Sequence, residues 1–133
     1  MEQPKYLIDT NSVIDYLGQR LPSDGMEYMH SVIDALPNIS VITKIELLSF
    51  NTSPEPYAVL YNFTRDANVL DLNNNIVEAC IIIRKNYKTK LPDAIIAASA
   101  IVYNLVLITR NISDFKNIPG LKTIDPYSLP NKS

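Results

Sequence analysis

Four acidic residues occupy positions in the sequence where they could hold a cation, namely Asp9, Glu46, Asp93 and Asp114. Asp9 directly follows an apolar run, and Asp114 comes soon after another. Carboxylates gathered in one place repel each other unless a cation neutralises them. A ligand set made only of oxygen favours Mg²⁺, with Mn²⁺ as a substitute. Zinc is disfavoured, because the chain has one His and one Cys, far apart in sequence.

Each acid also has an ordinary structural interpretation. Asp9 could cap the helix that follows it, and Asp93 could add a favourable charge at a helix N-terminus. Asp114 could close a turn in the loop after a strand. Thr43 and Glu46 have the spacing of a capping box, which would place Glu46 in a first helical turn. Convergence of all four acids on one place would favour a metal site instead.

The pattern of the surrounding elements predicts such convergence. Short apolar or β-branched runs predict strands at residues 5–8, 38–41, 68–70, 105–108 and 121–124. Helical spacing marks residues 26–36, 43–50, 57–63, 76–87 and 94–103, and a further helix is expected to begin near Ser12. This alternation predicts an α/β fold with a central, mostly parallel sheet of four to five strands and helices on both faces. The carboxyl ends of parallel strands share one edge, where the acids would meet.

Length and composition fit one soluble globular domain spanning residues 1–133. The chain is 47% hydrophobic and 20% charged. No apolar run reaches the ~18–20 residues that span a membrane, and the first residues do not have the pattern of a signal peptide. The single Cys80 cannot form an internal disulfide. We therefore expect a cytoplasmic protein with no membrane association.

The net charge limits how this chain could bind nucleic acid. Twelve Lys and Arg against fourteen Asp and Glu give −2. A sequence-independent binder of duplex nucleic acid is usually clearly basic. If nucleic acid is a partner, the phosphates need another attraction, such as a divalent cation held by acids.

Four segments resemble, in order and separation, the motifs of the PIN-domain family, specifically the VapC-type toxins of VapBC toxin–antitoxin modules. They are residues 6–11 (YLIDTN), 40–48 (SVITKIELL), 90–98 (KLPDAIIAA) and 107–115 (LITRNISDF). The resemblance implies a PIN domain with Mg²⁺-dependent endoribonuclease activity, held inactive by a cognate antitoxin and forming a homodimer. It also implies that the catalytic and metal-binding residues are Asp9, Glu46, Asp93 and Asp114, supported by Thr10, Asn11, Thr109 and Asn111.

A metal-activated water would then attack an RNA phosphate, without a nucleophilic side chain. Lys44, Arg84 and Arg110 are candidate phosphate contacts. Their alternative interpretation is solvated charge or, for Arg84, complementing the dipole at a helix C-terminus.

Two other classes of protein are alternatives to the nuclease. One is a catalytically silent PIN-like domain that binds protein or RNA without cutting. The other is a Mg²⁺-dependent phosphatase or receiver domain on a similar fold. A haloacid-dehalogenase-type phosphatase would have a second aspartate where this chain has Asn11, and a receiver would have adjacent acids before its phosphorylated aspartate. Neither pattern occurs here, so the nuclease interpretation is favoured.

Overall fold

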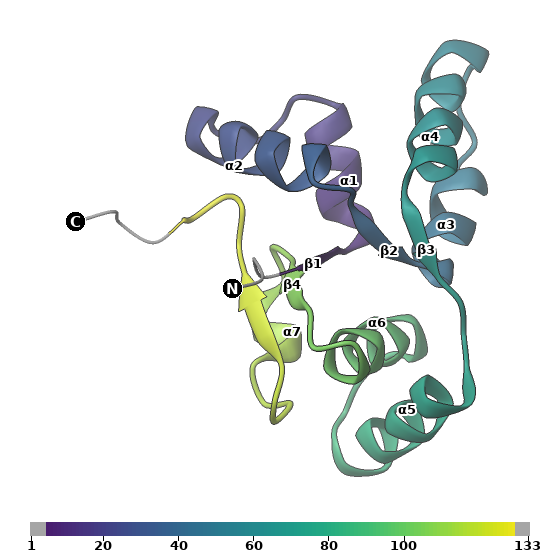
Figure 1. The fold of residues 1–133 in the computed structure, drawn as a ribbon, viewed down its shortest axis with the longest axis vertical. Helices are drawn as coiled ribbons and strands as arrows, with labels where there is room; N and C mark the ends of the chain where they lie inside the picture. The colour runs from purple at the N-terminus through teal and green to yellow at the C-terminus, as the bar shows by residue number, and fades with distance from the viewer. Residues whose placement is uncertain (1–4, 130–133) are drawn as a thin grey trace.

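The computed structural model describes residues 5–129, so the ends of the expected domain, residues 1–4 and 130–133, lie outside the described part. A five-stranded sheet forms the centre of the molecule (Figure 1). All four strand pairings are parallel, which confirms the expected sheet. In spatial order the strands are β3 (Asn68–Leu70), β2 (Asn38–Ser40), β1 (Tyr6–Ile8), β4 (Val106–Ile108) and β5 (Lys122–Ile124).

Helices cover both faces of this sheet. Figure 1 shows α5 and α6 on one side and α1 and α2 on the other, with α3 and α4 as a neighbouring pair beside β3. Their bounds are α1 (Thr10–Leu17), α2 (Ser23–Asp34), α3 (Val41–Leu48), α4 (Pro54–Asp66), α5 (Asn74–Asn86), α6 (Leu91–Val102) and α7 (Ile112–Phe115). Among the described residues, no helix has the length and apolar character needed to cross a bilayer.

Alternation of side chains along the strands explains the continuous apolar runs. Leu7 and Leu107 belong to the hydrophobic cluster that includes α5 and α6. Their neighbours Ile8 and Ile108 belong to the cluster that includes α1 and α2. Successive residues of a strand point to opposite faces, so a sheet covered on both sides needs apolar side chains at consecutive positions.

The apolar helix expected at residues 94–103 is central. Seven consecutive residues of α6, from Ala94 to Ala100, are buried. The one hydroxyl among them, on Ser99, donates to the carbonyl oxygen of Ile95 at 2.8 Å. The Ser99 hydroxyl is thus hydrogen-bonded although the helix is buried on all sides. Because α6 is packed so tightly, it holds Asp93, in its first turn, in a fixed position.

Three sequence-based expectations about local structure are wrong. The α3 helix begins at Val41, because Ser40 is the N-cap and accepts a hydrogen bond from the Ile42 N–H. Thr43 is therefore a buried residue within the helix, and the proposed capping box does not form.

Asp114 lies in the short helix α7 instead of a loop. Leu36 was expected to end the helix marked at residues 26–36, but it follows α2 with a φ of 71° and is 59% exposed.

The strand order reverses between β1 and β4. From β1 the chain proceeds outward through β2 and β3, and it then returns to place β4 on the other side of β1, followed by β5. In open α/β sheets the ligand site lies beyond the carboxyl ends of the strands at such a reversal. Asp9 directly follows β1 and Thr109 directly follows β4, so the sequence places polar residues on both sides of this point.

Candidate active site

Asp9 is fixed at the centre of this edge. Its Oδ1 accepts from the Ser12 N–H at 2.8 Å, which makes it the N-cap of α1, as expected. Its own N–H donates to the Ile108 carbonyl oxygen at 3.1 Å. Burial raises the pKa of Asp9 above its ordinary value, although hydrogen bonding by Thr109 and Ser12 opposes that rise. A buried carboxylate held this rigidly is well placed to bind a cation.

Asp93 links the four acids electrostatically. It is half-buried in the first turn of α6, and burial is the largest cause that raises its pKa. The negative charges of Asp114 and then Asp9 raise the pKa of Asp93 further. The charge of Glu46 raises the pKa of Asp93 by a smaller amount, and the positive charge of Lys90 lowers the pKa of Asp93. The structure therefore brings acids from four separate segments to one edge of the sheet.

Glu46 is held in place by a hydrogen bond from another helix. Thr10 Oγ1 lies 2.6 Å from Glu46 Oε1 and 3.0 Å from Thr43 Oγ1. A hydroxyl has one hydrogen and an ionised carboxylate can only accept, so Thr10 donates to Glu46. Glu46 is otherwise exposed, whereas Thr43 is fully buried. Thr10 therefore ties the first turn of α1 to α3 and orients the Glu46 carboxylate.

The other supporting residues lie at the same edge. Thr109 is fully buried after β4, and its N–H donates to the Ile124 carbonyl oxygen at 2.9 Å. The Thr109 Oγ1 accepts from the Asn111 N–H at 3.0 Å, which shapes the turn into α7. Asn11 is exposed in the first turn of α1. Thr109 lies beside Asp9, whereas a chemical role for the Asn11 and Asn111 side chains stays a prediction.

The three candidate phosphate contacts have different surroundings. Arg84 donates from Nη1 to the Thr89 carbonyl oxygen at 2.7 Å, so it also holds the connection between α5 and α6. The Arg110 guanidinium lies over the Tyr127 ring, with Cζ 4.2 Å from the ring centroid. Lys44 is exposed on α3. Contact between any of the three and phosphate stays a prediction.

The acidic set suits Mg²⁺ by its chemistry. All four side chains offer hard carboxylate oxygens, and their mutual repulsion would be relieved by a divalent cation. Within residues 5–129, no group of three or more His, Cys, Asp or Glu side chains is placed closely enough to hold a metal ion together. Mg²⁺ commonly keeps several waters and binds through one or two carboxylates. A largely hydrated Mg²⁺ held directly by one or two of these carboxylates would fit the arrangement, and binding of the ion stays a prediction.

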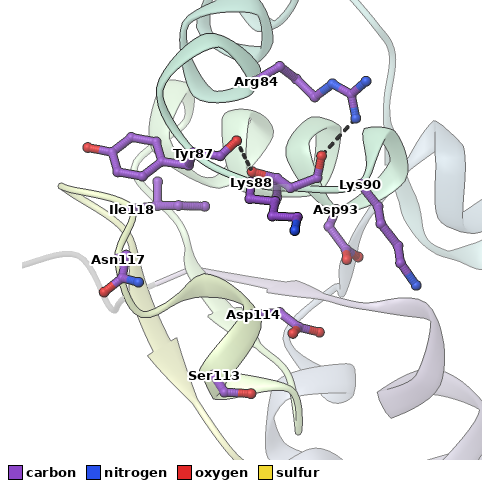
Figure 2. A pocket seen from close by; sticks show the side chains of 10 residues that line it. Arg84, Tyr87, Lys88, Lys90, Asp93, Ser113, Asp114, Asn117 and Ile118 are labelled. Carbon is purple, nitrogen blue, oxygen red and sulfur yellow. Dashed lines mark hydrogen bonds between the residues drawn. The ribbon is translucent and has the colours of Figure 1, made fainter.

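A cleft of about 610 Å³ opens beside the acids. Figure 2 shows Asp93 and Asp114 at one end of it, with the α5–α6 connection on one wall and the segment from α7 onward on the other. Ser113, Asn117 and Ile118 line the second wall, and sequence reasoning missed all three. Ser113 and Asn117 were missed because a polar residue next to a turn carries no signal that separates a ligand contact from ordinary turn chemistry. Ile118 was missed because an apolar residue is more often part of the core.

The fold and the acids at its point of reversal define a single-domain α/β protein with an acidic site at the edge of its parallel sheet. The PIN domain family matches residues 6–121, and the chain belongs to that family. The family membership predicted from the four sequence motifs is thus confirmed.

Solved structures extend this relationship. A chain of a toxin–antitoxin complex from Klebsiella pneumoniae is 31% identical, with a TM-score of 0.74, and the match covers 94% of this chain and 100% of that chain. A chain of DNA-bound VapBC from Salmonella typhimurium matches at 27% identity with a TM-score of 0.79, and the match covers 93% of this chain and 99% of that chain. A chain of VapBC-1 from nontypeable Haemophilus influenzae matches at 26% identity with a TM-score of 0.72, and the match covers 92% of this chain and 98% of that chain. The resemblance to VapC-type PIN toxins is confirmed. A comparison with curated proteins gives no match.

Proposed function

We propose that this protein is a Mg²⁺-dependent endoribonuclease that acts as the toxin of a toxin–antitoxin module. Membership in the PIN domain family and likeness to chains of VapBC complexes support the role of a toxin nuclease. The observation that carries the chemistry is the convergence of acids from four segments at the reversal of strand order, namely Asp9, Glu46, Asp93 and Asp114. Acids so arranged suit metal-assisted hydrolysis of a phosphodiester.

The four acids would hold Mg²⁺, or Mn²⁺ in its place. When bound, the ion supplies an activated water at neutral pH and stabilises negative charge on the attacked phosphate. Asp9 is fixed by its cap to α1, and Thr10 orients Glu46. Asp93 and Asp114, which line the neighbouring cleft, complete the set. No nucleophilic side chain is needed.

RNA is itself an anion, so it needs positive charge beside the acids. Lys44 and Arg110 extend from elements that also carry site residues, α3 and the end of β4. Both are exposed. Their charges would hold phosphates that flank the one being cut, and would offset repulsion between the substrate and the acids.

The direct test is cleavage of a panel of RNAs by the purified protein, with sequencing of the 5′-phosphate ends. Cleavage is expected in Mg²⁺ and should disappear in excess chelator. Asp93→Asn should be inactive while its melting curve shows a folded protein. Glu78→Gln is a matched control, because Glu78 is an exposed acid of α5 that does not line the cleft. Binding of RNA without any cleavage would favour the catalytically silent PIN-like domain.

Protein partners are part of the same proposal. Large apolar side chains are exposed on and next to α3 and α4, namely Ile45, Phe50, Tyr57, Val59 and Tyr61. Such a concentration on one part of a surface is typical of protein contacts. It supports binding of a cognate antitoxin and formation of a homodimer. Growth arrest on expression alone, relieved by the antitoxin or by Asp93→Asn, is the expected cellular result.

A further inference from the structure

The cleft extends well beyond the acids that form one of its ends. Its volume of about 610 Å³ lies within the range of pockets that enclose small ligands. Only Asp93 and Asp114 of the four acids line it. The rest of the lining comes from the α5–α6 connection and the segment that follows α7, so most of the cleft has no part in holding a cation (Figure 2).

One lysine lies between the acids and the remainder of the cleft, namely Lys88, whereas Lys90 extends on the far side of Asp93 (Figure 2). Lys88 and Lys90 both line the cleft, and neither forms an ion pair within residues 5–129. Figure 2 shows the Lys88 side chain reaching into the space between Asp93 and Ile118. An unpaired ammonium group next to carboxylates that would hold a cation is well placed for a second phosphate.

The connection that carries these lysines has a defined shape. The Arg84 guanidinium donates to the Thr89 carbonyl oxygen at 2.7 Å. The Thr89 Oγ1 donates to the Tyr87 carbonyl oxygen at 3.2 Å. These bonds are drawn in Figure 2 and hold the segment from the end of α5 to the start of α6. Lys88 therefore projects from a fixed backbone.

The end of the cleft away from the acids has the chemistry of a base site. Tyr87 is half-buried and Ile118 is buried, and both lie at that end (Figure 2). The half-buried Tyr87 ring offers an aromatic surface for the face of a base, and it packs against the hydrophobic cluster that contains Ile118. Asn117 is exposed beside them, and its amide provides both donors and an acceptor. Proteins read single-stranded RNA by combining such apolar contact with hydrogen bonds to base edges.

We propose that this cleft binds the nucleotide next to the scissile phosphate, with Lys88 contacting its phosphate and Asn117 reading its base. The inference rests on the proposed RNA cleavage and adds a specificity-determining residue to it. A phosphate contact positions the strand without sequence information, whereas an amide at a base edge selects the base. The two residues should therefore give different signatures when they are replaced.

The first experiment uses RNAs randomised around one cut site, with the cut ends sequenced. Asn117→Ala should reduce the base preference at one position beside the cut by roughly ten-fold and leave the other positions unchanged. Lys88→Ala should lower kcat/KM for all sequences alike. It should also make the plot of log kcat/KM against log salt concentration shallower by about 0.7 to 1. Lys85→Ala, which changes a lysine of α5 outside the cleft, should do neither.

A second experiment does not depend on cleavage. Adenosine 3′,5′-bisphosphate is titrated into ¹⁵N-labelled protein in chelator, and the side-chain amide signal of Asn117 is followed. The signal should shift in the wild type and shift much less in Lys88→Ala. Both residues are exposed, so their variants should keep the wild-type melting temperature.

The outcomes separate this inference from the proposed function. If the wild type cuts RNA but Asn117→Ala keeps its base preference and Lys88→Ala behaves like Lys85→Ala, the nucleotide site is wrong and the nuclease stands. If the wild type cuts no RNA, the nuclease is wrong, and the titration alone decides the cleft. A bisphosphate that leaves the Asn117 signal unmoved would then overturn the site.

Discussion

The Asp9 carboxylate contributes to both structure and chemistry. It caps α1 by accepting from the Ser12 N–H, and it also lies among the acids of the candidate site. The cap needs only an acceptor oxygen, which an amide also has. The metal site needs the negative charge. Asparagine at this position therefore keeps one contribution and removes the other.

Replacing Asp9 should change stability by different amounts depending on the new side chain. Burial raises the pKa of Asp9, so its ionised form is disfavoured in the folded protein. In metal-free buffer at pH 7, Asp9→Asn should therefore melt higher than the wild type. Asp9→Ala also loses the cap and should be less stable than Asp9→Asn by about 1 kcal/mol. Urea denaturation in chelator measures both differences.

The pH dependence checks the cause. Because the pKa is higher in the folded state, the stabilisation from protonating Asp9 is present at low pH and is lost as the pH rises through the folded pKa. The advantage of Asp9→Asn should therefore shrink on acidification. An Asp9→Asn variant that melts below the wild type at pH 7 would show that the charge itself is stabilising.

Replacing Thr10 tests how the Glu46 carboxylate is oriented while all four acids are kept. Thr10→Val removes the hydroxyl that lies 2.6 Å from Glu46 Oε1, whereas Thr10→Ser keeps it. Partners that orient a metal ligand typically contribute 10–100-fold. We expect Thr10→Val to lower kcat/KM by roughly that factor and Thr10→Ser to stay within a few-fold of the wild type. Equal activity of the two variants would remove Thr10 from the site.

At the scale of elements, α2 is packed against the segment that follows β5. Gly25 is buried in α2, and a Cβ there would collide with the backbone carbonyl oxygen of Pro126. Pro126 is itself fully buried. The close approach of the helix to this segment requires glycine, because backbone atoms cannot move aside as a flexible side chain can.

Gly25→Ala should therefore destabilise the protein, although the same change inside a helix usually stabilises by about 1 kcal/mol. The collision should cost about 1–3 kcal/mol in the free energy of unfolding. Glu27→Ala, at an exposed position of the same helix, is the control and should change it by less than about 0.5 kcal/mol. A Gly25→Ala variant that melts above the wild type would mean that the segment after β5 is readily displaced.

The sequence predicted all five strands within one residue at either end, because apolar runs bounded by polar residues are a strong signal. It did not place the start of α3, since both Ser40 and Thr43 are good N-cap residues and only the end of β2 decides between them. It did not show α7, because four residues are too few for a helical period.

The candidate site follows the same division. The positions of Asp9 and Asp93 were predictable because Asp9 lies just beyond a strand and Asp93 near the start of a helix, where parallel strands share an edge. Glu46 was expected in the first turn of its helix, but it lies in the second half of α3. Asn117 and Ser113 were not predictable, because their place in the cleft depends on how the segment from α7 onward packs beside the α5–α6 connection. Contacts between segments distant in sequence leave no local pattern.

For the whole molecule, the choice of cation is the sharpest test of the proposed chemistry. Mg²⁺, Mn²⁺ and Ca²⁺ all accept oxygen ligands, so each should bind the acids and stabilise the fold. At one hundred times the dissociation constant, the gain is about 2.7 kcal/mol. Asp93→Asn should reduce this stabilisation for all three ions. Melting curves against ion concentration measure it without reference to activity.

The rate of RNA cleavage should differ between the three ions even though all three bind. Ca²⁺ is larger and more flexible in its coordination than Mg²⁺, and it activates water less well. We therefore expect cleavage of a single RNA in Mg²⁺ and Mn²⁺, and at most weak cleavage in Ca²⁺ at equal site occupancy. Occupancy is matched from the melting data, so weak binding cannot explain a low rate. Equal turnover in Ca²⁺ would contradict a mechanism in which the ion activates the attacking water. Full turnover in excess chelator would point to a side-chain base, because the acids would then act without a cation.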